Sequence, residues 1–168
     1  MTDAPTRLNG RQVYDLAVRI ALAWREIRRG ASTGPLRHFL YGIDDEAIEQ
    51  GQMDTLDLLA IKESWRMSEL AEALKVEPST ATRAVQRLVK DGLAQRRPSK
   101  VDGRVVKVEI TDAGREVHKV VAERRAQLFT HILANFGHAE LPVLADVMER
   151  FVRSVDEFVQ SQGDPPLK

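Results

Sequence analysis

Basic side chains are concentrated in one stretch of this sequence, residues 83–107. Eight arginines and lysines stand there against two aspartates, although the whole chain is balanced at 25 basic and 25 acidic residues. A balanced net charge gives no information about binding partners, whereas the distribution of charge along the chain does give such information. Guanidinium and ammonium groups at this density neutralise phosphates, so the chemistry indicated is the binding of a polyanion. The acidic run at residues 44–57 is interpreted as a solvated face.

The second half of the basic stretch has the pattern of a β-hairpin. Valines alternate with other residues in "RVVKVEI" (104–110), "LAQRR" (93–97) supplies a partner strand, and "DG" (102–103) marks the turn. An arginine at a hairpin tip can enter the minor groove of DNA, where the negative potential is enhanced over narrow A·T stretches. A neighbouring aspartate can orient its guanidinium. The candidate DNA-contacting residues here are Arg97, Ser99, Lys100, Asp102 and Arg104.

The first half of the basic stretch predicts an amphipathic helix. "EPSTATRAVQRLVKDG" (77–92) has Pro78 in a first-turn position and Gly92 as its C-terminal stop. Short hydroxyls and long guanidinium forks on its outer face suit close approach to base edges in the major groove. The expected buried stripe is Ala81, Ala84, Val85, Leu88 and Val89, and the candidate DNA contacts are Ser79, Thr80, Thr82, Arg83 and Arg87. Taken alone, this helix is better explained by an ordinary solvated face. The hairpin that follows it favours DNA binding.

Further helices must position these two elements. Apolar residues recur at helical spacing in several segments, and Thr111 is a good N-cap for the first of two long C-terminal helices. The expected segments are residues 11–29, a short helical turn at 36–42, compact helices at 56–61 and 67–74, and long helices at 111–135 and 141–159. The helices expected at 11–29, 111–135 and 141–159 expose more apolar surface than one small domain can cover. A homodimer is therefore favoured over helices folded back on their own chain.

Residues 67–116 resemble the winged-helix core of the MarR-type bacterial transcription regulators. The family's wing pattern, Asp-x-Arg followed after five residues by an aliphatic residue and Thr, is met by Asp102, Arg104, Ile110 and Thr111. The flanking helices fit the family's layout over residues 11–160. Both the wing and the preceding helix carry the resemblance, and together they are more specific than either alone.

Two positions depart from the family's pattern. Lys75 stands where a turn glycine is common, which predicts a strained turn between the two helices. Ala81 replaces a larger aliphatic residue. This predicts looser packing behind the helix at 77–92, the candidate recognition helix for the major groove.

The resemblance implies a mainly α fold with a small β-hairpin wing, that is, a winged helix-turn-helix plus long dimerisation helices. It implies a sequence-specific double-stranded DNA-binding regulator, a ligand-responsive repressor that binds a pseudo-palindromic operator as a homodimer. The division expected is dimerisation helices at 1–30 and 112–162, a winged helix-turn-helix at 54–111, a connecting segment of undefined structure at 31–53, and a disordered tail at 163–168.

Other classes of function have weaker support. A winged-helix protein-interaction or dimerisation module without specific DNA binding is the alternative, and the basic run argues against it. An enzyme is not expected, because the sequence shows no Gly-rich phosphate loop, nucleophile motif or catalytic triad. The chain has no cysteine, and no cofactor is expected. No apolar run approaches the ~20 residues of a membrane span, and no signal peptide is recognised, so a cytoplasmic location is expected.

A small aromatic or lipophilic effector is implied by the resemblance. The candidate ligand-binding residues are Trp24, His38, Phe39, Tyr41 and Trp65. Core packing explains Trp24 and Tyr41 equally well, and it explains Trp65 better. His131, His138 and Glu140 can be drawn as a metal site, but their spacing is not compact, so no metal is expected.

Overall fold

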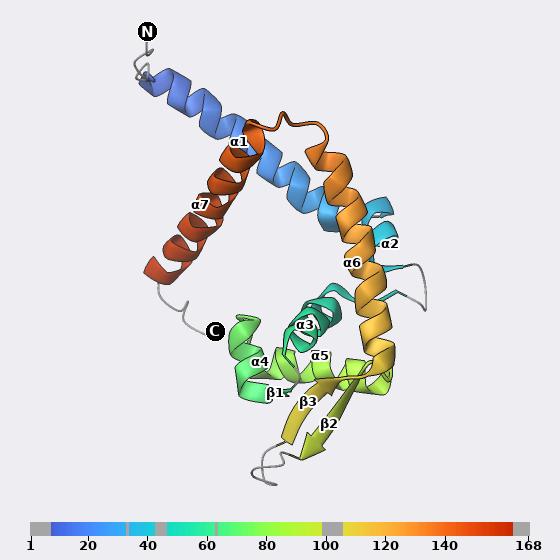
Figure 1. The fold of residues 1–168 in the computed structure, drawn as a ribbon. Coiled ribbons are helices and arrows are strands. Elements are labelled where there is room, and N and C mark those ends of the chain that lie inside the picture. The colour runs from blue at the N-terminus through green and yellow to red at the C-terminus, as the bar shows by residue number, and fades with distance from the viewer. Residues whose placement is uncertain (1–7, 33, 43–46, 63, 99–105, 163–168) are drawn as a thin grey trace. The chain divides into compact units, whose positions relative to one another are not determined.

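The computed structural model describes residues 8–32, 34–42, 47–62, 64–98 and 106–162 (Figure 1). The chain divides into two compact units, residues 1–124 and 125–168. The elements in order are α1 (Gly10–Ser32), α2 (Pro35–Tyr41), α3 (Gln50–Ile61), β1 (Trp65–Arg66), α4 (Met67–Ala73), α5 (Pro78–Lys90), β2 (Ala94–Pro98), β3 (Val106–Ile110), α6 (Asp112–Leu133) and α7 (Glu140–Ser161). The mainly helical fold with a small β wing is confirmed. Within the described ranges no helix is long and apolar enough to cross a membrane.

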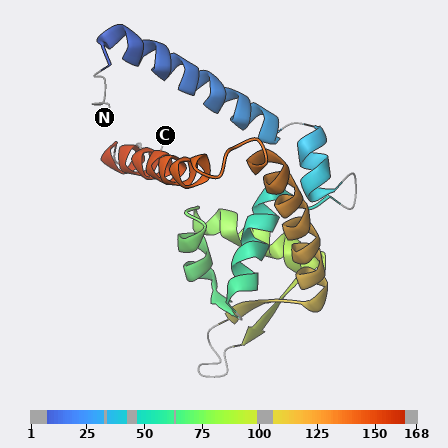
Figure 2. The same ribbon diagram turned by 45° about the horizontal axis from the view of Figure 1, so that its top comes forward.

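One hydrophobic core holds α3, α4, α5 and the sheet together in the first unit, and both views show these elements packed against one another (Figure 1, Figure 2). Every member of the sheet is antiparallel, in the order β1-β3-β2. The largest fully buried side chains are Met53, Thr55, Leu56, Leu59, Leu70, Val85, Leu88 and Val108. Because β3 is the central strand, its register with β2 fixes which wing residues face the core. Ala94 pairs with Ile110, and Arg97 pairs with Lys107.

The helix α5 follows the predicted amphipathic pattern. Pro78 lies in its first turn, and Gly92, with a φ of 72°, follows its C-cap residue. Ala81, Val85 and Leu88 are buried at three- and four-residue spacing. The predicted buried stripe included one residue too many, because Val89 is 36% exposed.

The turn before α5 contains the strain that the sequence predicts. Lys75 has a φ of 53°, and no other non-glycine residue in the described part of the chain has a positive φ. A side chain in this left-handed region places its Cβ against the backbone, which glycine avoids.

The start of α6 is joined to the turn between α5 and β2. The Thr111 hydroxyl accepts a hydrogen bond from the Gly114 N–H at 3.1 Å and donates one to the Gly92 carbonyl at 2.7 Å. The predicted N-cap role of Thr111 is therefore confirmed. Gly114 is buried, and a Cβ built on it would overlap the carbonyl oxygen of Leu93. This close approach of helix and turn fixes the base of the wing.

Three details differ from the sequence-based expectations. Gly30 does not end the first helix, because α1 continues to Ser32. The two-residue strand β1 was not predicted, since two residues are too short to show alternation. Ile61, expected in a buried helix, is 79% exposed at the last position of α3.

Two helices, one in each unit, have large exposed apolar side chains. On α1 they include Val13, Tyr14, Ile20, Trp24 and Ile27; on α7 they include Val143, Val147, Val152, Phe158 and Val159. So many large apolar side chains exposed on a helix are unusual for a monomer in water.

Candidate nucleic-acid interface

The outer face of α5 presents polar and basic side chains to solvent. Ser79, Thr80, Arg83 and Arg87 are exposed, as predicted. Thr82 is half-buried, and its hydroxyl donates to the Pro78 carbonyl oxygen at 2.7 Å. Because that proton is already used within the helix, Thr82 is better placed to accept a hydrogen bond than to donate one.

Arg87, near the C-terminal end of this face, is in contact with an acidic residue from another element. Its Nη1 forms a hydrogen-bonded ion pair with Glu49 Oε2. Both side chains remain more than half exposed, at 54% and 55%. The pair is therefore reachable by a third charged group from solvent.

The wing strands carry a second set of basic side chains. Arg97 on β2 lies with Nε 3.4 Å from Glu109 Oε2, and its Nη2 donates to Gln95 Oε1 at 3.3 Å. Its neighbour Arg96 is exposed and stands opposite Val108 in the register. Ser99, Lys100, Asp102 and Arg104, predicted to contact DNA from the wing tip, lie outside the described residues.

An open depression lies between the recognition helix and the wing. Its lining residues are Met67, Thr82, Arg96, Arg97, Pro98 and Val106. This mixture of basic and apolar residues suits the mixed chemistry of a sugar-phosphate backbone. Sequence reasoning left Arg96 out of the candidate set. Its presence in the basic run was the available signal, but only the tertiary structure places it beside this depression.

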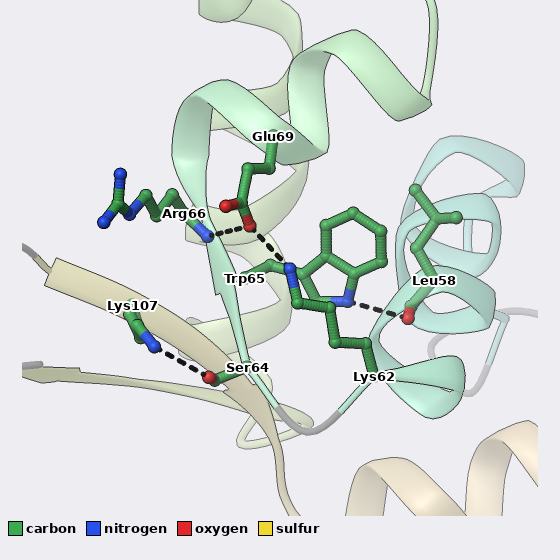
Figure 3. Close-up of polar contacts among 7 residues, drawn as sticks. All are labelled: Leu58, Lys62, Ser64, Trp65, Arg66, Glu69 and Lys107. Carbon is green, nitrogen blue, oxygen red and sulfur yellow. Dashed lines mark hydrogen bonds and ion pairs between the residues drawn. The ribbon is translucent and has the colours of Figure 1, made fainter.

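Polar contacts at the base of the wing join α3, α4 and β3 (Figure 3). Lys62 Nζ donates to Glu69 Oε2 at 2.8 Å, and the backbone N–H of Arg66 donates to the same oxygen at 3.2 Å. The hydrogen bond from Lys62, with that from Arg66, lowers the pKa of the Glu69 carboxyl. Lys107 on β3 donates to Ser64 Oγ at 3.4 Å.

Trp65 is held within this same network. Its indole N–H donates to the Leu58 carbonyl oxygen at 2.9 Å, and Lys62 Nζ lies 4.6 Å from the ring centroid (Figure 3). The side chain also packs against the hydrophobic core. Its polar group and one ring face are thus engaged within the protein, which supports the packing interpretation of Trp65 over the ligand one.

Comparison with known proteins shows what this geometry is similar to. Residues 48–106 match the model of the MarR family. The likeness to this family is thus a likeness of the region from α3 to the start of β3. YdgJ, an uncharacterised HTH-type transcriptional regulator of Bacillus subtilis (strain 168), is 27% identical over 109 residues, which are 65% of this chain and 66% of YdgJ, just under two thirds of its length. The family and such relatives are transcription regulators, not enzymes.

Solved structures of two proteins support the same fold. Streptococcus pneumoniae FabT, solved in complex with DNA, has a TM-score of 0.67 and 19% identity, over 89% of this chain and 99% of FabT. PcaV from Streptomyces coelicolor, in complex with its natural ligand, has a TM-score of 0.57 and 21% identity, over 92% of this chain and 99% of PcaV. At these identities the likeness shows that the MarR-type winged-helix fold is shared.

The remaining effector candidates differ in how far they are buried. Tyr41 is half-buried and packs against the core, and Ile48 N–H donates to its carbonyl oxygen at 3.0 Å. Trp24 on α1, and His38 and Phe39 on α2, are exposed. Of the five, Tyr41 and Trp65 pack against the hydrophobic core of the first unit.

Among the histidines, His118 contacts a carboxylate of another helix. His118 Nε2 is 3.3 Å from Asp57 Oδ1, which links α6 to α3. His131 and His138 are exposed. Among the described residues there is no group of three or more His, Asp or Glu side chains that could hold a metal ion.

Proposed function

We propose that this protein is a sequence-specific double-stranded DNA-binding regulator that places α5 in the major groove and its wing at the adjacent minor groove. The observation that carries the proposal is the exposed polar and basic face of α5, beside a depression lined by Arg96 and Arg97. Base edges are read by short hydroxyls and arginine forks, and guanidinium groups bind phosphates. FabT, which shares this fold, was solved with DNA.

The proposed assembly is a homodimer on a pseudo-palindromic operator. The apolar side chains exposed on α1 and α7 support it, because burying them against a second copy removes apolar area from water. Two winged domains related by a two-fold axis read half-sites of matching symmetry.

The proposed mode of control is repression relieved by a small aromatic or lipophilic effector. PcaV, solved with its natural ligand, shares the fold and supports this part of the proposal. An effector changes DNA affinity only through its different affinities for two shapes of the protein, typically by ~1–3 kcal/mol. Selection of bound duplexes from a random pool, repeated with candidate aromatic acids present, identifies the operator and tests the response.

The experiment that tests DNA binding is fluorescence anisotropy on the selected operator at several salt concentrations. Arg104→Ala removes one cationic contact per subunit, so at about −0.9 per phosphate the slope of log K against log[salt] flattens by about 1.8 per dimer. Arg83→Ala is expected to lose about 1–3 kcal/mol per half-site and to relax preference at one base pair.

Arg25→Ala is the matched control, because Arg25 lies on α1 in an exposed pair with Glu26. It is expected to leave both the slope and the base preference unchanged. Binding that shows neither salt dependence nor sequence preference would contradict the proposed function and would favour a protein-interaction module.

A further inference from the structure

The contact between Arg87 and Glu49 joins the recognition helix to the start of α3. Residue 49 is the N-cap of α3, 38 positions earlier in the chain than Arg87. The arginine belongs to the face of α5 that is proposed to meet DNA, so its partner occupies a place where a phosphate would bind.

Glu49 is carried by an anchored piece of backbone. Its N–H donates to Gln52 Oε1 at 3.3 Å, and the Gln52 side chain, only 6% exposed, donates to Asp91 Oδ2 at 2.9 Å. The preceding residue, Ile48, is buried in the core. Two residues of α3's first turn therefore contact two residues at the end of α5. This arrangement fixes the carboxylate beside Arg87, so less conformational freedom is lost when the pair forms.

A carboxylate and a phosphate compete for the same guanidinium. Both present oxygens that match the forked donors of arginine. An ion pair exposed to solvent is weak, because water and salt screen it, so DNA can displace the carboxylate. Displacement leaves the charge of Glu49 uncompensated next to the DNA backbone, and that charge is repelled.

We propose that Glu49 is a competitor for DNA: it occupies Arg87 in the free protein, releases it when α5 docks, and thereby lowers the affinity and the salt dependence of binding. This inference rests on the proposed DNA-binding function. It adds to the DNA site a residue that the charge pattern alone had assigned to a solvated acidic face. The extent to which Glu49 lowers the DNA affinity depends on Arg87. This dependence distinguishes the proposal from a general electrostatic repulsion between acidic residues and DNA.

The test is a double-mutant cycle on the full-length protein with Glu49→Gln, Arg87→Gln and the double variant, measured by anisotropy on the selected operator. Glu49→Gln keeps the side-chain shape and removes the charge. We expect roughly three- to thirtyfold tighter binding by the dimer. The salt slope should steepen by up to about 1.8, because the two phosphate contacts made by Arg87 in the dimer no longer leave an uncompensated carboxylate beside the DNA. In the Arg87→Gln background the same substitution should change affinity less than twofold.

Glu77→Gln is the matched control, because it removes the same charge at the other end of α5, where its side chain makes no capping hydrogen bond within the described structure. Equal gains for Glu49→Gln and Glu77→Gln, persisting without Arg87, would show general repulsion and overturn the proposal. The proposal would also be overturned if the wild type binds the operator and Glu49→Gln, which unfolds normally in urea, binds it with the same affinity. Failure of the wild type to bind any duplex would instead reject the proposed function, and this inference with it.

Discussion

Single arginines on the candidate DNA surface differ in what they contact within the protein. Arg87 is paired with Glu49, and Arg97 lies beside Glu109. Arg83, in the middle of the same helix face, has no ion pair with another described residue. We therefore expect Arg83 to interact with DNA without first leaving a carboxylate, whereas Arg87 must exchange partners. Charge totals along the sequence treat these residues alike, and the pairing separates them.

At the same scale, Glu69 predicts a pH dependence of stability. Its pKa is lowered in the folded protein, first by the hydrogen bond from Lys62 and then by that from the Arg66 N–H. A depressed folded pKa means that the contribution is present above the ordinary value of 4.5 and is lost as pH falls through the folded pKa. Glu69→Gln should therefore lower the urea midpoint at pH 7, and its difference from wild type should shrink on acidification to pH 3.

Glu72→Gln provides the comparison for that experiment, since Glu72 is exposed on the same short helix. Its difference from wild type should be smaller at pH 7 and should change less on acidification. If the difference in urea midpoint between wild type and Glu69→Gln stayed constant from pH 7 to pH 3, the ion pair between Lys62 and Glu69 would not contribute to stability.

At the scale of elements, the wing depends on how closely α6 approaches the turn after α5. Gly114→Ala should raise helix propensity locally, yet the added Cβ would overlap the Leu93 carbonyl and crowd Ile110 at 2.9 Å. We expect a net loss of about 1–3 kcal/mol in the free energy of unfolding, measured by urea denaturation.

Gly30→Ala is the control for that substitution. Gly30 lies in α1, and a Cβ added to it would meet no described atom within 4 Å apart from its own helix backbone and chain neighbours. The same change should there stabilise the helix by about 0.5–1 kcal/mol. If both variants were stabilised, the close contact between Gly114 and Leu93 would not exist in solution.

At the scale of the whole molecule, the exposed apolar faces of α1 and α7 predict self-association. Deleting residues 140–168 removes α7 and should give aggregates or a monomer that no longer binds the operator, because the remaining apolar surface lacks its partner. Sedimentation velocity and anisotropy on the same samples measure both properties. The full-length chain, expected to be a dimer, serves as the reference. Tight binding of a palindrome by the truncated protein would contradict the predicted assembly.

Local chemistry let the sequence by itself determine much of this protein. The limits of α5 follow from Pro78 and Gly92, the start of α6 follows from Thr111, and the strained turn follows from Lys75. Each depends on a backbone preference or a hydrogen bond that spans a few residues. Alternation of apolar residues also predicted β2 and β3, and the charge pattern identified the exposed face of α5.

Only the tertiary structure decided which distant groups meet. Strand β1 exists because Trp65 and Arg66 pair with β3, and two residues carry no periodicity of their own. Gly114 is required by a turn 21 positions earlier, at Leu93. The pairing of Arg87 with Glu49 joins α5 to the N-cap of α3 through two residues 38 positions apart in the chain. Such contacts are set by the packing of elements around a shared core, and neither propensity nor spacing along the chain encodes which side chains that packing brings together.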